Sequence, residues 1–250
     1  MLTEERRNEI VRLINENKAC SVTELTRVLN SSEATIRRDL NALHEAGKIK
    51  KVHGGATSLL SSYSLEEDEN TKKYKLNTES KRVIAEAAAK LIKPNEFIYI
   101  DAGTTTEFMA DYITEKTAVF VTNGVSIGRK LAKKGFNVYL VAGKLKATTE
   151  AIISSEAVNT IERYNFTKGF FGTNGITVDE GYTTPDIDEA RIKTAAMGKC
   201  KNRYILADSS KFNKITAVTF ADIKKAEIIT DKAYDKKYFS YTKITEAEKK

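Results

Sequence analysis

The apolar positions of residues 1–56 recur with the period of short amphipathic helices. Ile10, Leu13 and Ile14 follow Thr3 with i, i+3, i+4 spacing among themselves, which predicts a helix with Thr3 as its N-cap and one buried stripe. A second helix is predicted from about residue 23 and a third from about residue 33. The pattern indicates three short helices that pack on one another.

The third predicted helix has the clearest polarity. Ser32 is placed to cap its start, and Gly47 suits the left-handed position after its end. At about 100° per residue, Ile36 and Leu40 share one face and polar residues occupy the opposite one. Residues 48–52 then alternate like a strand. This order is typical of a winged helix-turn-helix, in which one helix enters the major groove of DNA.

From about residue 78 onward, short apolar strands alternate with helical stretches. This alternation indicates an α/β domain with a largely parallel sheet. The predicted division is a DNA-binding domain over residues 1–56, a linker over 57–77 and a sensing domain over 78–250. Within the last of these, residues 232–250 fit either a frayed tail or a closing strand. The expected strands are residues 97–100, 119–122, 138–141, 168–172, 204–207 and 228–230.

Composition excludes several classes of protein without selecting one. Of 250 residues, 41% are hydrophobic and 30% charged, so the chain can bury a sizeable core. No apolar run approaches the ~20 residues of a membrane helix, and no signal peptide is evident, which predicts a cytoplasmic protein without a membrane partner. Cys20 and Cys200 are interpreted as reduced, buried thiols, and no metal site is expected from two His.

The net charge of +7 permits a nucleic-acid partner, but its distribution is more informative. Residues 1–56 carry 10 Lys+Arg and 8 Asp+Glu, a balance of only +2, whereas five basic and two acidic residues lie between Arg37 and Lys51. Arginine can grip guanine or a phosphate, so double-stranded operator DNA is the expected partner. The alternative is a three-helix bundle with solvated arginines. The candidate DNA-binding residues are Ser32, Glu33, Thr35, Arg37, Arg38, Lys48, Lys50, Lys51, His53 and Gly54.

Small and hydroxyl residues follow several strands of the predicted α/β domain. Ligands of open α/β sheets bind beyond the carboxyl ends of the strands, and Gly/Thr loops that open helices suit a phosphate. Glu189 and Lys193 are four residues apart and by default form a surface ion pair, but they can equally line the pocket. The candidate ligand-binding residues are Asp101, Gly103, Thr104, Thr105, Thr106, Thr122, Asn123, Gly124, Gly143, Lys144, Asn174, Gly175, Asp186, Glu189, Lys193 and Lys211.

Several of these segments resemble the signature of the DeoR family of bacterial transcription regulators. The segments are residues 32–40, Ser-Glu-Ala-Thr-Ile-Arg-Arg-Asp-Leu, residues 52–56, Val-His-Gly-Gly-Ala, and the loops at 101–105, 122–124, 174–175, 183–193 and 208–212. The resemblance implies a Rossmann-like effector domain similar to sugar-phosphate isomerases. Within the family, the sequence most resembles those of fructose-operon repressors, which implies fructose 1-phosphate as effector. Two departures, Ala142 and Ser154 where the family usually has glycine, put the identity of the effector in question.

The sequence therefore predicts a repressor of a sugar-utilisation operon whose DNA affinity is switched by a phosphorylated sugar. It is not expected to be an enzyme or to hold a cofactor, and paired half-sites in DNA predict a homodimer or homotetramer. The alternative is a sugar-phosphate isomerase with an appended DNA-binding domain, because Asp186, Glu189 and Lys193 suit acid–base chemistry. The chain has no dinucleotide or P-loop motif.

Overall fold

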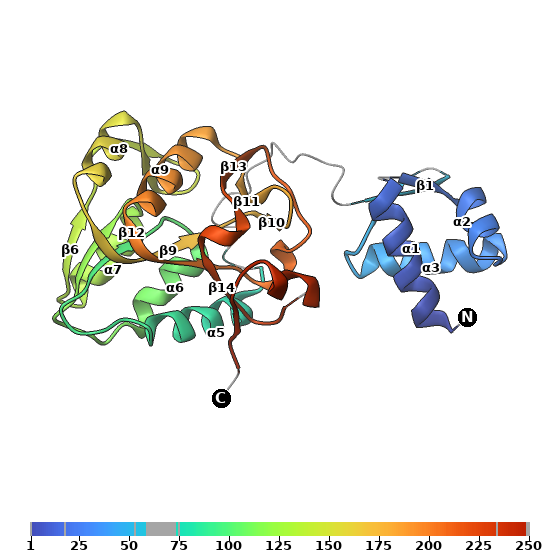
Figure 1. Cartoon of the computed structure of the whole chain (residues 1–250), viewed down its shortest axis with the longest axis horizontal. Helices are drawn as coiled ribbons and strands as arrows, with labels where there is room; N and C mark the ends of the chain where they lie inside the picture. Colours follow the sequence, from blue (N-terminus) through green and yellow to red (C-terminus); the bar gives the residue numbers. More distant parts are fainter. Residues whose placement is uncertain are drawn as a thin grey trace. The chain divides into compact units, whose positions relative to one another are not determined.

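The computed structural model describes residues 2–17, 19–52, 54–58, 74, 76–233 and 235–248. Its contacts divide the chain into two compact units, Met1–Tyr63 and Ser64–Lys250 (Figure 1). Within the described ranges, no helix combines the length and the apolar character needed to cross a membrane. The predicted linker lies mostly outside the described residues, which omit 59–73 and 75.

The first unit is a helix-turn-helix with a small wing. Its strands form an antiparallel sheet in the order β1-β3-β2. The sequence pattern missed β1, because three residues are too few to show a period. The elements are α1 (Thr3–Asn17), β1 (Ala19–Ser21), α2 (Val22–Val28), α3 (Glu33–Glu45), β2 (Lys50–Val52) and β3 (Gly55–Thr57).

Local signals set the two ends of α3. The Ser32 side chain accepts a hydrogen bond from the Thr35 amide, as expected of an N-cap. Gly47 has φ +65°, and the Lys48 amide donates to the Leu43 carbonyl at 2.8 Å, the long hydrogen bond of a Schellman motif. Both predictions for this helix are confirmed. The prediction for Thr3 is wrong by one position, since α1 already begins at Thr3.

The buried stripes of the three helices form the core of the first unit. Ile10, Ile14, Ile36 and Leu40 are almost completely buried in it. The unit also extends past residue 56, where the sequence placed its end. Thr57 is the last residue of β3, and the buried Ser58 hydroxyl donates to Asn15 Oδ1 at 2.6 Å.

The second unit has a parallel sheet as its centre. In the described residues this sheet has seven strands in the order β15-β14-β12-β9-β4-β5-β6, and its adjacent strands pair in parallel. Its strands are β4 (Phe97–Ile100), β5 (Val119–Thr122), β6 (Asn137–Leu140), β9 (Phe166–Gly172), β12 (Cys200–Leu206), β14 (Glu227–Thr230) and β15 (Ile244–Glu246). Strand β15 closes the sheet, so residues 232–250 contain a strand and are not wholly a frayed tail.

Helices cover both faces of this sheet (Figure 1). One face carries α5 (Thr78–Ala89), α6 (Thr104–Tyr112) and α7 (Val125–Lys133), and the other carries α8 (Ser155–Glu162) and α9 (Ile187–Gly198). Alternate residues of β4 explain the arrangement, because Ile98 and Ile100 pack on the face of α5, α6 and α7, whereas Tyr99 packs on the face of α8 and α9.

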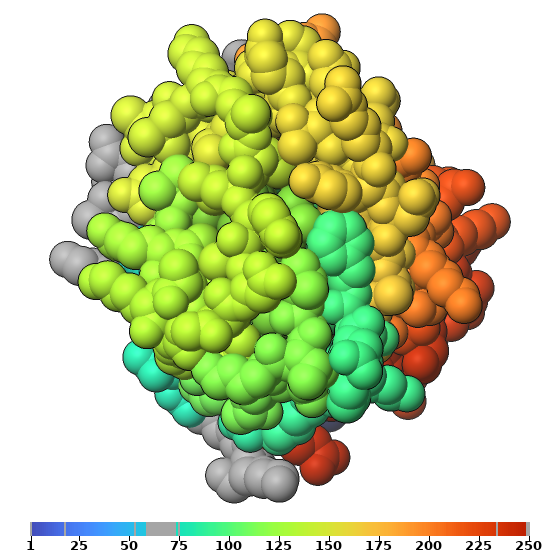
Figure 2. Space-filling model, turned by 90° about the vertical axis from the view of Figure 1, so that its left-hand side faces the viewer, coloured from blue at the N-terminus to red at the C-terminus, as the bar shows by residue number. Residues whose placement is uncertain are grey.

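Among the described residues, two smaller strand groups and three 3-10 turns were not predicted from the pattern. One group is an antiparallel sheet in the order β10-β11-β13, and the other is the hairpin β7–β8. The hairpin follows the edge strand β6, whose exposed residues belong to the part of the chain coloured yellow-green on the surface in Figure 2. Their short strands each contain Gly, Ala, Thr or Lys, so the sequence pattern does not distinguish them from the loops beside them. They are β7 (Lys144–Lys146), β8 (Ala151–Ile153), β10 (Gly175–Thr177), β11 (Gly181–Thr184) and β13 (Val218–Ala221), with η2 (Ser209–Lys211), η3 (Ile223–Lys225) and η4 (Lys236–Ser240).

Ser154 occupies a backbone conformation that suits glycine. Its φ is +129° and its ψ 174°, a region that costs other residues on the order of 1–3 kcal/mol. We expect Ser154→Gly to raise the free energy of unfolding by about 1 kcal/mol after the entropy of the added glycine is subtracted, as measured by urea denaturation. Ser155→Gly, in the first turn of α8, is the control and is expected to give no gain. A less stable Ser154→Gly protein would contradict the assignment of strain.

Candidate functional site

The outward face of α3 presents the two predicted arginines. Arg37 and Arg38 are exposed, and each is held along the helix: Arg37 pairs with Glu33 at 3.3 Å, and Arg38 Nε donates to the Ala34 carbonyl at 3.3 Å. Ser32 and Glu33 are exposed at the start of α3, and Thr35 is half-buried. This arrangement leaves two guanidinium groups available on the face opposite the core.

The wing adds further cations next to this helix. Lys48 and Lys50 are exposed, and Lys51 Nζ donates to Asn41 Oδ1 at 2.6 Å, which ties the wing to α3. Gly54 is exposed with φ +82°, a conformation that glycine adopts without strain. The predicted contact His53 lies outside the described residues.

Two residues that support this face were missed from the sequence. Asn41 is exposed one helical turn after Arg37, so the i+4 spacing could have identified it. Asp39 is buried on the inner side of α3, where it accepts hydrogen bonds from Arg6 Nε at 2.7 Å and Arg7 Nε at 2.8 Å. Asp39 therefore fixes α3 against α1, a contact that no sequence spacing reveals.

In the second unit, the main polar pocket lies at the carboxyl ends of β4, β9 and β12. The chain order of the sheet reverses between β4 and β9, and ligands of open α/β sheets bind at such switch points. Of the predicted residues, Gly103, Thr104, Thr105, Asn174, Glu189, Lys193 and Lys211 line this pocket. The other lining residues are Lys81, Ala102, Thr149, Gly172, Thr173 and Leu206.

The start of α6 forms one wall of the pocket. Gly103 is the N-cap, and within the described residues no side chain caps the first amides of this helix. Thr104 and Thr105 line the pocket, whereas the Thr106 hydroxyl points back and donates to the Gly103 carbonyl at 2.8 Å. A helix start of this kind attracts an anion through its amides and its dipole.

Lysines approach the pocket from two other elements. Lys211 belongs to η2, whose N-cap Asp208 accepts from the Ser210 amide at 3.0 Å and from Asn77 Nδ2 at 2.9 Å. Lys81 is buried in α5 on the same stripe as Ile84. A lysine within an apolar helical stripe is unusual, so this position could have been recognised from the sequence.

A buried ion pair lies beneath the pocket. Lys193 Nζ pairs with Asp101 Oδ2, and the same carboxylate oxygen accepts from the Gly172 amide at 3.0 Å. Burial raises the pKa of Asp101, and the charge of Lys193 offsets only part of that rise. Lys193 lines the pocket, but its ammonium group is already paired with a carboxylate of the protein.

Glu189 is the second carboxylate of the pocket. Its Oε1 accepts from Thr149 Oγ1 at 2.8 Å and from Lys146 Nζ at 3.3 Å. Burial would raise the pKa of Glu189, but the charges of Lys193 and Lys146 and these hydrogen bonds outweigh it and lower the pKa. Glu189 is thus an anionic hydrogen-bond acceptor near neutral pH.

Comparison with known families matches both units of the chain. The DeoR-like helix-turn-helix domain matches residues 6–62, and the DeoR C terminal sensor domain matches residues 76–232. The chain belongs to the DeoR family of transcriptional regulators.

Relatives cover almost the whole length of this DeoR-family chain. It is 43% identical over 98% of its length to the uncharacterized HTH-type transcriptional regulator FruR of Bacillus subtilis (strain 168), of which it covers 97%. It is 33% identical over 98% of its length to the lactose phosphotransferase system repressor of Streptococcus mutans serotype c (strain ATCC 700610 / UA159), of which it covers 99%. These relatives are transcriptional regulators, and the chain is a DNA-binding transcriptional regulator of this family.

Among solved structures, ribose 5-phosphate isomerase A from Methanocaldococcus jannaschii is similar with a TM-score of 0.40 and 13% identity. That match covers 54% of this chain and 55% of the isomerase chain.

Other predicted ligand residues of the DeoR-family sensor lie outside the polar pocket. Asn123 is buried behind the loop after β4, where its Oδ1 accepts from the Ala102 amide at 2.8 Å and from the Tyr99 hydroxyl at 3.0 Å. Strand order explains Thr122, Gly124, Gly143 and Lys144, because the ends of β5 and β6 lie on the far side of β4 from β9. Three others are held by the protein: Asp101 pairs with Lys193, the Thr106 hydroxyl donates to the Gly103 carbonyl, and Asp186 is the N-cap of α9. Gly175 is the first residue of β10 and pairs with Thr183 of β11. The predicted residues that do not line the pocket are Asp101, Thr106, Thr122, Asn123, Gly124, Gly143, Lys144, Gly175 and Asp186.

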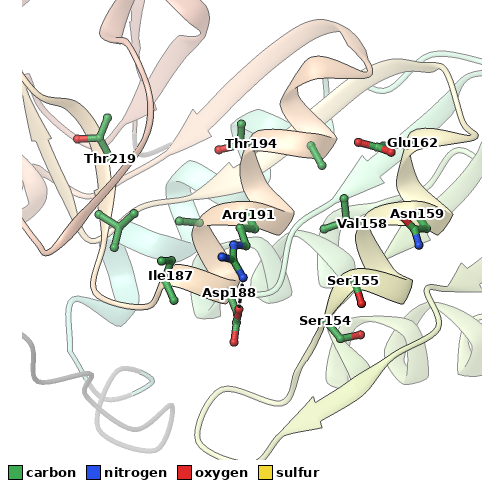
Figure 3. A pocket seen from close by; sticks show the side chains of 13 residues that line it. Ser154, Ser155, Val158, Asn159, Glu162, Ile187, Asp188, Arg191, Thr194 and Thr219 are labelled. Atoms are coloured by element: carbon green, nitrogen blue, oxygen red, sulfur yellow. Dashed lines mark hydrogen bonds and ion pairs between the residues drawn. The ribbon is translucent and has the colours of Figure 1, made fainter.

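A larger hollow lies between α8 and α9 (Figure 3). It has a volume of about 580 Å³, and Val158, Ile187, Arg191 and Thr194 are among its lining residues. None of the predicted ligand residues lines it, and Arg191 is paired with Asp188 at 3.3 Å. The polar pocket therefore fits the expected chemistry better than the larger hollow does.

Proposed function

We propose that this DeoR-family regulator represses a sugar-utilisation operon and that a phosphorylated sugar, with fructose 1-phosphate as first candidate, switches its affinity for DNA. The observation that carries the proposal is the pocket at the switch point between β4 and β9. One set of groups in this pocket is the anion-binding start of α6 with nearby lysines, and the other is the Glu189 carboxylate with the Asn174 side-chain amide. A molecule with a phosphate and several hydroxyl groups matches both sets of groups.

The phosphate end of the pocket is assigned to the start of α6 and two lysines. Thr104 and Thr105 offer amides and hydroxyls, and Lys81 and Lys211 offer positive charge. Charge-assisted hydrogen bonds of this kind are about twice as strong as neutral ones. They favour a phosphorylated sugar over the free sugar.

The sugar end is assigned to Glu189 and Asn174. Glu189 is anionic and accepts hydrogen bonds, and Asn174 offers both a donor and an acceptor in the same pocket. Such groups suit sugar hydroxyls. The repressors of lactose phosphotransferase systems among the relatives agree with a sugar-derived effector.

We also assign the DNA contacts to residues of α3 and the wing. Arg37 and Arg38 are proposed to contact base edges or phosphates, and Lys48, Lys50, Lys51 and His53 to hold phosphates of the DNA backbone. We propose that the regulator acts in the cytoplasm. We further propose that it is a homodimer or homotetramer, because a DNA site made of two symmetric half-sites requires a symmetric protein. Coupling between effector and DNA is expected to be about 1–3 kcal/mol.

A ligand panel tests the assignment of the pocket. Wild-type protein is heated with fructose 1-phosphate, fructose 6-phosphate, ribose 5-phosphate, fructose or inorganic phosphate, and the melting temperature is measured. A sugar phosphate at 100 times its Kd is expected to stabilise the protein by about 2.7 kcal/mol. If no sugar phosphate of the panel raises the melting temperature, the proposed function is wrong.

Lys211→Met tests the phosphate end of the pocket. The substitution removes a charge and is expected to weaken binding of fructose 1-phosphate about tenfold, as measured by calorimetry. Lys225→Met is the matched control, because Lys225 is exposed and does not line the pocket. Equal affinities of the two variants would remove Lys211 from the site.

A further inference from the structure

The β7–β8 hairpin reaches over the start of α9 and holds its acidic residues. Lys146, the last residue of β7, pairs with Asp186 at 2.7 Å and with Glu189 at 3.3 Å. Thr149, in the turn of the hairpin, donates to Glu189 at 2.8 Å. One hairpin therefore supplies two of the donors to the pocket carboxylate.

The hairpin is itself well anchored on its inner strand. The amide of Ile152 donates to the Asn123 carbonyl at 2.7 Å, and β8 is buried, whereas Lys144 and Leu145 of β7 are exposed. The side chain of Lys146 is only 15% exposed, so it is drawn in toward α9 while its neighbours face solvent. This difference within a short strand indicates that Lys146 has a specific partner.

Both hairpin contacts to Glu189 go to the same oxygen, Oε1. They orient the carboxylate, and the charges of Lys193 and Lys146, together with these hydrogen bonds, lower the pKa of Glu189. Asp186 is committed elsewhere, since its Oδ1 accepts from the amides of Asp188 and Glu189 as the N-cap of α9. Glu189 is consequently the carboxylate that the hairpin presents to the pocket.

We propose that Lys146 and Thr149 are specificity-determining positioning residues of the effector site, which hold Glu189 as the acceptor for a sugar hydroxyl. The inference rests on the proposed function and adds the hairpin to the site. It predicts that the hairpin acts on recognition of the sugar and leaves recognition of the phosphate unchanged, because the phosphate is assigned to α6, Lys81 and Lys211.

The test compares two ligands on one set of variants. Calorimetry measures the Kd of fructose 1-phosphate and of inorganic phosphate for wild type, Lys146→Met, Lys146→Arg and Lys144→Met. Lys146→Met is expected to weaken fructose 1-phosphate about tenfold and to leave inorganic phosphate unchanged. Lys146→Arg restores the charge and is expected to recover most of the affinity. Lys144→Met, on the same strand but exposed, is expected to match wild type.

Two results would overturn the inference while the proposed function stands. In the first, Lys146→Met binds fructose 1-phosphate as tightly as wild type does. In the second, both ligands weaken equally, which is the behaviour of a hairpin that only supports the fold. Failure of wild type itself to bind fructose 1-phosphate or any other sugar phosphate of the panel would instead overturn the proposed function, and this inference with it.

Discussion

Lys193→Ala is expected to lower the free energy of unfolding of the sensor unit by about 3–5 kcal/mol. The substitution leaves the carboxylate of Asp101, which is only 1% exposed, without its ion-pair partner, and an uncompensated buried charge is strongly destabilising. For a unit of this size the melting temperature is expected to fall on the order of 10 °C. Thermal denaturation followed by circular dichroism measures the change.

The neighbouring Arg191 provides the matched control for this prediction. Its side chain is 67% exposed and pairs with Asp188 across one turn, so Arg191→Ala is expected to change stability by less than about 0.5 kcal/mol. The double variant Asp101→Asn with Lys193→Met removes both charges and is expected to recover part of the loss. If Lys193→Ala melts like wild type, the buried ion pair does not stabilise the fold as argued.

Arg38→Ala is expected to weaken DNA binding by about 1–3 kcal/mol for each DNA-binding unit engaged, and by up to twice that in a dimer. Arg38 is exposed on α3 opposite the buried stripe, and its side chain is long enough for the guanidinium group to reach a base edge or a phosphate. Gel shifts at several salt concentrations measure the effect on a DNA fragment that the wild-type protein selects from a random pool.

The salt dependence separates the two possible roles of Arg38. If Arg38 contacts a base, Arg38→Ala is expected to lower affinity for the selected fragment more than affinity for random DNA. If Arg38 contacts a phosphate, the substitution is expected to lower both affinities and to reduce the salt slope by about 1. Arg12→Ala is the control, because Arg12 is an exposed residue of α1 that pairs with Glu9 and Glu16. An unchanged midpoint for Arg38→Ala would place this arginine outside the interface.

Local sequence signals predicted the DNA-binding unit well. Ser32 and Gly47 act on the backbone within a few residues of themselves, so the limits of α3 follow from local chemistry. The outward position of Arg38 follows from helical geometry once Ile36 and Leu40 are assigned to the core. The clamp of Asp39 to Arg6 and Arg7 did not follow, since it joins positions more than 30 residues apart.

For the sensor unit, the sequence determined that short strands end in loops of small and hydroxyl residues, but not which loops meet. That choice depends on strand order, and β9 returns to lie beside β4 after two intervening strands of the sheet. The loops after β4 and β9 therefore form the pocket, and the loop after β5 does not. Hydrogen bonding between strands and burial of both sheet faces set this order, and these interactions act over distances along the chain that no local spacing records.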